Sequence, residues 1–173
     1  MTLEQASRIL RPKVCLPSLP CEMVLDPAFG IAEYIDDSKT GKVRNKLDIK
    51  KWRQDRPSAE IFFVRGIGNA ACDVEDPKVH KVLGCYYQET ANDLGVVFVD
   101  VTDDDFEVAG ILAHEWGHRR TLPHTKNSRA LMWCYSRPKY FPGPKSVDIS
   151  DDEWLTLIDP LVNRYNKLRE SCD

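Results

Sequence analysis

The chain has 173 residues, of which 42% are apolar and 29% charged, and these values are typical of one globular domain with a sizeable core. The formal net charge of -3 does not indicate a partner chosen by bulk electrostatics, and the basic residues between positions 42 and 56 come with no nucleic-acid-binding module. No apolar run reaches the length of about 18 residues that crosses a bilayer, so we expect no membrane span.

The predicted elements become clearer along the chain. Residues 1–60 contain several early prolines, which predict an extended, turn-rich segment, and a helix is expected near residues 43–54. Apolar, β-prone runs then predict a buried strand at 61–64, a short edge strand at 85–87 and the clearest strand at 95–101. Asp103, Asp104 and Asp105 supply capping groups and first-turn negative charge for a helix over about 106–119.

The last third of the sequence predicts a loop and then helices. Residues 125–149 contain three prolines and a glycine between 138 and 144, which is typical of a loop. The run Ser150-Asp151-Asp152-Glu153 is a capping box that opens a helix. Asp159-Pro160 interrupts this helix and fits the start of a second one.

Six cysteines favour disulfides and an oxidising compartment, so the composition favours a secreted or extracytoplasmic location. Six thiols allow 15 complete pairings, and the sequence does not choose among them. The first ten residues, MTLEQASRIL, lack the basic start and apolar block of a secretory signal.

Three of the four histidines fall within eleven residues, in the run His114-Glu115-Trp116-Gly117-His118 and its extension to His124. His114 and His118 are four apart on the predicted helix, so both imidazoles project from one face and can bind one zinc ion. Glu115 lies on the flank of that face, where it can reach a water molecule without being a ligand. Val108, Leu112 and Trp116 form an apolar stripe on the opposite side, which can pack on the sheet.

His124 completes the predicted metal site. Gly117 and the run Thr121-Leu122-Pro123 indicate that the helix ends soon after His118, so a turn can bring His124 back as the third ligand. Three protein ligands and one open position are typical of a catalytic zinc ion, whereas a structural site has a fourth protein ligand. We therefore expect one catalytic Zn²⁺.

These residues resemble the signature of the metzincin metallopeptidases, H-E-x-x-H-x-x-G-x-x-H followed by a methionine turn. Thr121 stands where the family has glycine, a residue that permits a sharp turn after the helix. Met132, eight residues after His124, looks like the methionine that forms a hydrophobic base beneath the metal. The resemblance covers about residues 60–170 by element order and is specific over 114–132, and it is greatest to the catalytic domains of matrix metalloproteinases.

The resemblance implies an α+β fold with a twisted mixed β-sheet, an active-site helix and a C-terminal helix. The chain is then one catalytic domain over 1–173, with an upper subdomain over about 1–120, a lower one over about 121–173 and zinc in the cleft between them. It also implies that an edge strand, here residues 85–88, pairs with an extended substrate, and that the loop 136–146 forms the specificity pocket. In some members a tyrosine near the methionine turn binds the metal or the oxyanion, which makes Tyr135 and Tyr140 candidates beside a purely structural role.

The predicted activity is zinc-dependent hydrolysis of internal peptide bonds by a monomer, with a protein or peptide as substrate. Zinc polarises the scissile carbonyl and lowers the pKa of its bound water, and Glu115 accepts the proton and passes it to the leaving amine. One alternative is a zinc peptidase of another clan, in which a distal carboxylate such as Asp151 or Glu153 replaces His124. Two others are a non-catalytic protein-binding module on the same fold and a zinc hydrolase that acts on something other than peptides.

Overall fold

The structure is a computed structural model that describes residue 6 and residues 41–72, 82–93, 95–101, 105–120, 122–125 and 131–132. Its elements in chain order are helix α2 (Lys46–Asp55), strand β1 (Ile61–Val64), the short 3-10 helix η2 (Asn69–Ala71), strands β2 (Gly84–Tyr87) and β3 (Val96–Asp100), and helix α3 (Asp105–Arg119). The two helices and three strands expected between positions 43 and 119 are therefore confirmed. The loop and helices predicted after residue 132 lie outside the described residues, so the predicted lower subdomain is described only at 122–125 and 131–132.

Helix α2 begins and ends where its sequence predicts a cap and a stop. The side chain of Asn45 accepts hydrogen bonds from the backbone N–H groups of Leu47 (2.9 Å) and Asp48 (3.1 Å), so it satisfies two donors of the first turn. Pro57 follows the C-cap residue Arg56, and a residue before proline disfavours the helical conformation. Because Asn45 is the cap, the helix starts at Lys46, slightly later than the expected residue 43.

The three strands form a mixed sheet in the order β1-β3-β2. Strand β3 lies in the middle, parallel to β1 and antiparallel to β2, and all five of its residues are buried. Strand β2 therefore lies at an edge of the described sheet, as predicted. Strand β1 lies at the other edge, and the prediction that it is buried is wrong for Phe63, whose side chain is 40% exposed.

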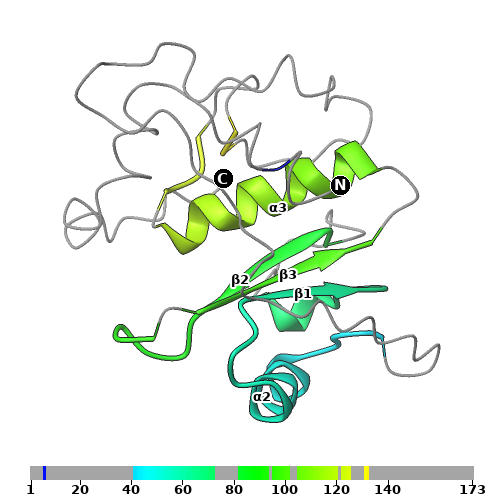
Figure 1. The fold of residues 1–173 in the computed structure, drawn as a ribbon, viewed down its shortest axis with the longest axis vertical. Helices are drawn as coiled ribbons and strands as arrows, with labels where there is room; N and C mark the ends of the chain where they lie inside the picture. Colours follow the sequence, from blue (N-terminus) through cyan, green and yellow to red (C-terminus); the bar gives the residue numbers. More distant parts are fainter. Residues whose placement is uncertain are drawn as a thin grey trace.

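The alternation of side chains along β3 divides the core into two clusters. Val97 and Val99 pack on the side of α3, whereas Val96 and Phe98 pack on the side of α2. Figure 1 shows the same arrangement, with the sheet between the two helices. Burying a side chain of this size contributes about 1.5–3 kcal/mol, so each cluster is a substantial source of stability.

The α3 side carries the predicted apolar stripe. Val108 and Leu112 are buried in its cluster and Trp116 packs against it, so this prediction is confirmed. Met132 is also buried there. Helix α3 is thereby fixed to the sheet along one side, which leaves its histidine-bearing side to face the chain that follows it.

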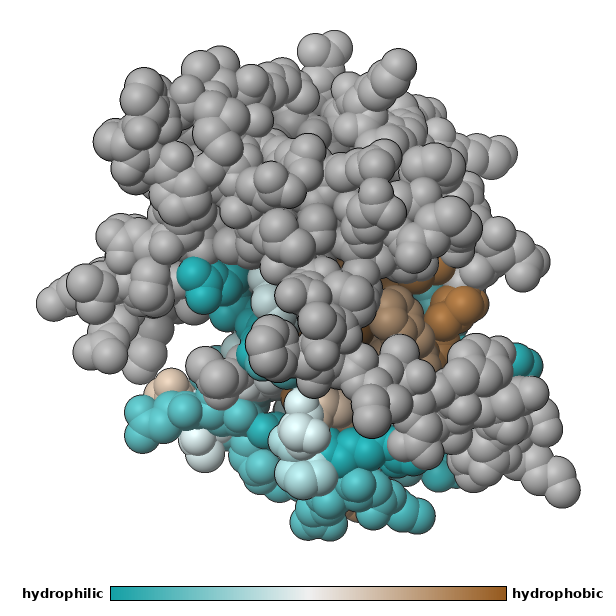
Figure 2. Space-filling model, in the orientation of Figure 1, coloured by the Kyte–Doolittle hydropathy of each residue, from teal (hydrophilic) through white to brown (hydrophobic). Residues whose placement is uncertain are grey.

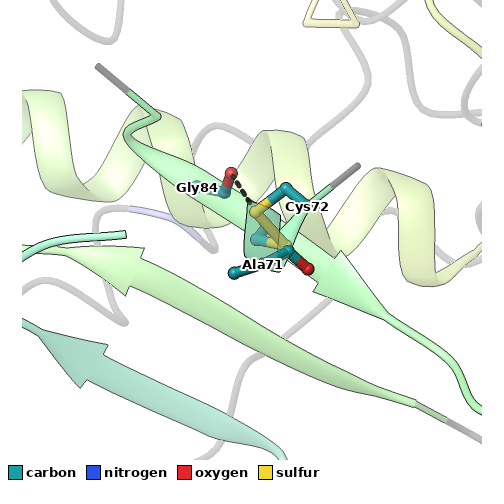
Figure 3. Close-up of a disulfide and its surroundings, with 4 residues drawn as sticks. Ala71, Cys72 and Gly84 are labelled. Atoms are coloured by element: carbon teal, nitrogen blue, oxygen red, sulfur yellow. Dashed lines mark hydrogen bonds between the residues drawn. A yellow bond between two sulfur atoms is a disulfide. The ribbon is translucent and has the colours of Figure 1, made fainter. Parts of the chain in front are cut away.

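The α2 side is held by aromatic contacts, an ion pair and a disulfide. Phe62 stacks on Phe98 with ring centroids 4.9 Å apart, and Arg53 donates two hydrogen bonds, of 2.6 and 2.8 Å, to the carboxylate of Asp93. Cys72 and Cys85 lie at disulfide distance and join the end of η2 to β2 (Figure 3). Figure 2 shows that the described surface around α2 is mostly hydrophilic.

The described part of the chain contains no helix that could span a membrane. Neither α2 nor α3 is long and apolar enough to cross a bilayer.

Candidate metal centre

Three imidazoles meet at the C-terminal end of α3. His114 and His118 project from neighbouring turns of the helix, and His124 reaches them from the segment after it. The Nε2 atoms of His114 and His118 are 3.1 Å apart, and the Nε2 atom of His124 is 3.3 Å from the first and 2.9 Å from the second. The predicted clustering of the three histidines is confirmed, and together they can hold a metal ion.

These separations suit one small ion. A tetrahedral ion with metal–nitrogen distances of about 2.05 Å places its nitrogen ligands about 3.3 Å apart. The separations of 2.9–3.3 Å correspond to ligand–metal–ligand angles of roughly 90 to 107° at that distance. Among the described residues, the three nitrogens are thus placed to hold one side of such an ion.

Two backbone carbonyls orient the rings for this role. The Nδ1 atom of His114 lies 2.8 Å from the Leu131 carbonyl oxygen, and that of His118 lies 2.9 Å from the Leu122 carbonyl oxygen. A carbonyl oxygen only accepts, so each Nδ1 carries the proton and each Nε2 carries a lone pair. Two such lone pairs cannot hydrogen-bond to each other. A cation between them makes their close approach favourable, and the donor set therefore fits a metal ion.

The environment of His114 keeps its ring neutral. Loss of hydration lowers the pKa of His114 from its ordinary value of 6.5 to about 4. The hydrogen bond to Leu131 acts in the opposite direction, and the neighbouring His124 lowers the pKa further. A ring with this pKa is uncharged at neutral pH, which is the state that binds a metal.

The chain after α3 is folded back by backbone hydrogen bonds. The Gly117 carbonyl accepts from the N–H groups of Arg120 and Leu122, both at 3.0 Å, and this closes the helix end. The N–H of Thr125 donates to the Met132 carbonyl at 2.9 Å, which ties the segment of His124 to that of Met132. The predicted turn after His118 is therefore present, although Thr121 itself lies outside the described residues.

Met132 packs against Gly117 of helix α3. A Cβ atom at Gly117 would collide with the sulfur of Met132, and the Met132 side chain is fully buried. The role of Met132 as a hydrophobic base beneath the metal stays a prediction. Gly117 has a role beyond the helix stop that the sequence indicated, because its missing side chain gives the methionine access to the helix backbone.

Glu115 lies beside the histidine cluster without belonging to it. Its side chain is 8% exposed and packs between α3 and β2, where a Cβ atom at Gly84 would overlap it. The role of Glu115 as a general base stays a prediction.

Other predicted site residues fall outside the described residues. They are the tyrosines Tyr135 and Tyr140, the alternative carboxylates Asp151 and Glu153, and the specificity loop 136–146. Sequence reasoning did not find the carbonyls of Leu122 and Leu131 or the contact of Gly84. No side-chain pattern indicates a backbone acceptor, whereas a glycine at the start of a strand was a visible signal for a close approach.

A second hollow lies away from the histidines. It has a volume of about 420 Å³ and lies at the carboxyl ends of the parallel strands β1 and β3, beside Lys42, Arg44, Arg65 and Asp100. Arg44 is already bound to Asp48 through Nε at 3.0 Å, so part of its charge is neutralised. The histidine cluster remains the stronger candidate for chemistry.

Comparison with known protein families, with curated proteins and with solved structures found no match for this chain.

Proposed function

We propose that this chain is a zinc-dependent endopeptidase in which His114, His118 and His124 hold the ion and Glu115 is the general base. The observation that carries the proposal is the convergence of three Nε2 atoms to within 3.3 Å of one another. Imidazole nitrogens suit several transition metals, and three of them with an open position are typical of catalytic zinc. The resemblance to the metzincin signature supports the same conclusion.

The composition of the site favours a catalytic ion over a structural one. In the part of the chain that the structure describes, no cysteine or carboxylate joins the three histidines in the cluster. A structural zinc ion has four protein ligands, whereas a catalytic one keeps a position for water or substrate. The carboxylate next in sequence to His114 adds the proton acceptor that peptide hydrolysis needs.

Zinc at this site would polarise the scissile carbonyl and lower the pKa of the attacking water. Glu115 takes a proton from that water, whose oxygen forms the new bond to the carbonyl carbon. As the C–N bond breaks, Glu115 delivers the proton to the leaving nitrogen, so the carboxylate is regenerated. The burial of Glu115 keeps bulk water from competing for this proton.

Strand β2 supports an extended peptide as the substrate. It lies at the edge of the described sheet and is antiparallel to β3. A peptide in extended conformation can add to such an edge through main-chain hydrogen bonds. Because Glu115 packs on Gly84 at the start of β2, a peptide on this edge would pass close to the proposed base.

The proposal is tested by incubating the zinc-loaded chain with a mixture of unstructured peptides and identifying new termini by mass spectrometry. We expect cleavage within the peptides that a chelator stops and added zinc restores. Glu115→Gln keeps the shape of the side chain, so it should retain one zinc per chain and lower turnover by about 10²–10⁴-fold. Cleavage by this variant at the wild-type rate contradicts the role of Glu115, and no cleavage by the loaded wild type contradicts the activity.

A further inference from the structure

Gly84 lies so close to Glu115 that no other residue fits without a displacement. A Cβ atom on Gly84 would come within 2.5 Å of Glu115 Oε1, 2.6 Å of Glu115 Cγ and 2.7 Å of Ile111 Cγ2. Real Cβ atoms essentially never approach other atoms to less than 3.0 Å. The backbone does not require glycine here, because the described glycines with positive φ are Gly66 and Gly95. The constraint at Gly84 is therefore steric.

Strand β2 cannot easily move away from α3 to make room. Gly84 pairs with Val99 in the sheet register, and the Asp100 N–H donates to the Leu83 carbonyl at 2.8 Å. The next residue, Cys85, is fixed by its disulfide to Cys72 on the face away from α3. The Cys72 sulfur also lies 3.9 Å from the Gly84 carbonyl oxygen, a packing contact drawn in Figure 3.

A Cβ at Gly84 would meet the side chains of Glu115 and Ile111, and Glu115 is the one that is displaced more easily. Ile111 is β-branched and 3% exposed, so its methyl group is held in the core. The Glu115 carboxylate is the far end of a side chain with three rotatable bonds. An added methyl group at position 84 must then move Glu115 Oε1 by at least about 0.5 Å, the difference between 2.5 and 3.0 Å, and it also strains the closer packing against Ile111.

We propose that Gly84 is a positioning residue for Glu115: its missing side chain sets where the carboxylate stands beside the three histidines. This inference rests on the proposed function, because it gives the position of the carboxylate a catalytic consequence. The three atoms nearest to a Cβ at Gly84 belong to Glu115 and Ile111, and none belongs to a histidine. Its effect passes through Glu115, so it differs from the effect of Gly117, whose missing side chain makes room for Met132.

The matched pair Gly84→Ala and Gly117→Ala separates the two effects. A misplacement of about 1 Å can cost about a hundredfold in rate, so Gly84→Ala should lower kcat by up to this factor. Its zinc affinity should stay within about threefold of the wild type, because the three histidines and the carbonyls that orient them are unchanged. Gly117→Ala disturbs the support of the histidines and should weaken zinc binding by about 10–100-fold, the usual range for outer-shell partners.

A stability measurement makes the test independent of activity. Gly84→Ala should lower the urea midpoint of the zinc-loaded wild type, because the methyl group meets Glu115. In the Glu115→Ala background the same substitution should lower the midpoint less, since the opposing side chain is gone. Measured together, kcat, zinc affinity and the two midpoint shifts distinguish a positioning role from a general weakening of the strand.

The outcomes separate the two proposals. Equal midpoint shifts in both backgrounds overturn the positioning role, as does an active Gly84→Ala variant with unchanged kcat. An inactive wild type overturns the peptidase, and the midpoint cycle then still decides whether Gly84 and Glu115 are coupled. A lower kcat with retained zinc affinity and unequal midpoint shifts supports the inference.

Discussion

Apolar side chains pack on both sides of the sheet, but the polar groups on the two sides have different kinds of partner. On the α2 side, the guanidinium of Arg53 meets the carboxylate of Asp93 through two short hydrogen bonds. On the α3 side, two imidazoles whose Nδ1 protons are held by carbonyls direct their lone pairs at the same point as His124. The first arrangement is complete without a ligand, whereas the second can hold a metal ion.

The α2 side therefore contributes packing, whereas the α3 side also carries the candidate metal site. The α2 side joins elements through the Phe62–Phe98 stack and the Cys72–Cys85 disulfide, and these interactions need nothing from outside the chain. On the α3 side, the same kind of apolar packing holds a helix whose other side carries the partly buried histidines of the candidate metal site. Substitutions on the α2 side should therefore change the unfolding free energy without changing metal binding. Substitutions of the histidines should weaken metal binding and change the unfolding free energy of the metal-free chain little.

The largest effect is expected from Phe98→Ala on the α2 side. Phe98 is fully buried in the central strand and stacks on Phe62, so its loss should reduce the unfolding free energy by about 3–5 kcal/mol. Phe63→Ala is the matched control, because Phe63 is 40% exposed and its loss should cost less. Urea denaturation in the presence of a chelator measures both. A change in metal stoichiometry of the folded Phe98→Ala variant contradicts the separation.

A somewhat smaller effect is expected from the metal. Zinc at a hundredfold excess over its dissociation constant should raise the unfolding free energy by about 2.7 kcal/mol, because it binds the folded state alone. The increase should be the same in the wild type and in Phe98→Ala, and absent in His118→Ala. Thermal or urea denaturation at fixed zinc concentration gives these values. Stabilisation of His118→Ala by zinc to the same extent shows that the ion binds elsewhere.

The smallest effect is expected from Asp93→Asn. The hydrogen bonds from Arg53 lower the pKa of the Asp93 carboxyl from 3.8 to about 2, with further contributions from the N–H groups of Gly95 and Glu89. Because this pKa is lowered on folding, the stabilisation is present above pH 3.8 and is lost as the pH falls towards 2. Asp93→Asn should cost about 1–2 kcal/mol at pH 6, a discounted value for a partly exposed pair.

The pH profile of that difference is the control. Unfolding free energies of the wild type and Asp93→Asn, measured between pH 6 and pH 2, should converge as the pH falls below about 4. Zinc binding at neutral pH should be the same in both proteins. A difference that persists unchanged at pH 2 means that the carboxylate charge is not its source.

The sequence predicted the elements that carry their own signals. Helix α3 follows from acidic residues at its start and an apolar stripe, and β3 follows from a continuous apolar run that is buried on both sides. The same reasoning failed at Phe63, because an apolar run does not reveal whether its strand lies in the middle or at an edge. The start of α2 was placed too early because the capping by Asn45 was not recognised.

Within the site, the sequence predicted which side chains come together but not the backbone carbonyls that orient them. Spacing alone placed His114, Glu115 and His118 on one part of a helix, and a turn signal brought His124 towards them. The carbonyls that fix the rings belong to Leu122 and Leu131, which no polar pattern distinguishes. The pairing of Cys72 with Cys85 likewise depends on how η2 approaches β2, and six cysteines alone allow 15 arrangements.

The most direct test of the metal centre is zinc stoichiometry by native mass spectrometry on the wild type, His124→Ala and His80→Ala. His80 is the fourth histidine of the chain and provides the matched control. We expect one zinc ion per chain in the wild type and in His80→Ala, and none in His124→Ala under the same conditions. Retention of one zinc ion by His124→Ala would contradict the three-histidine site.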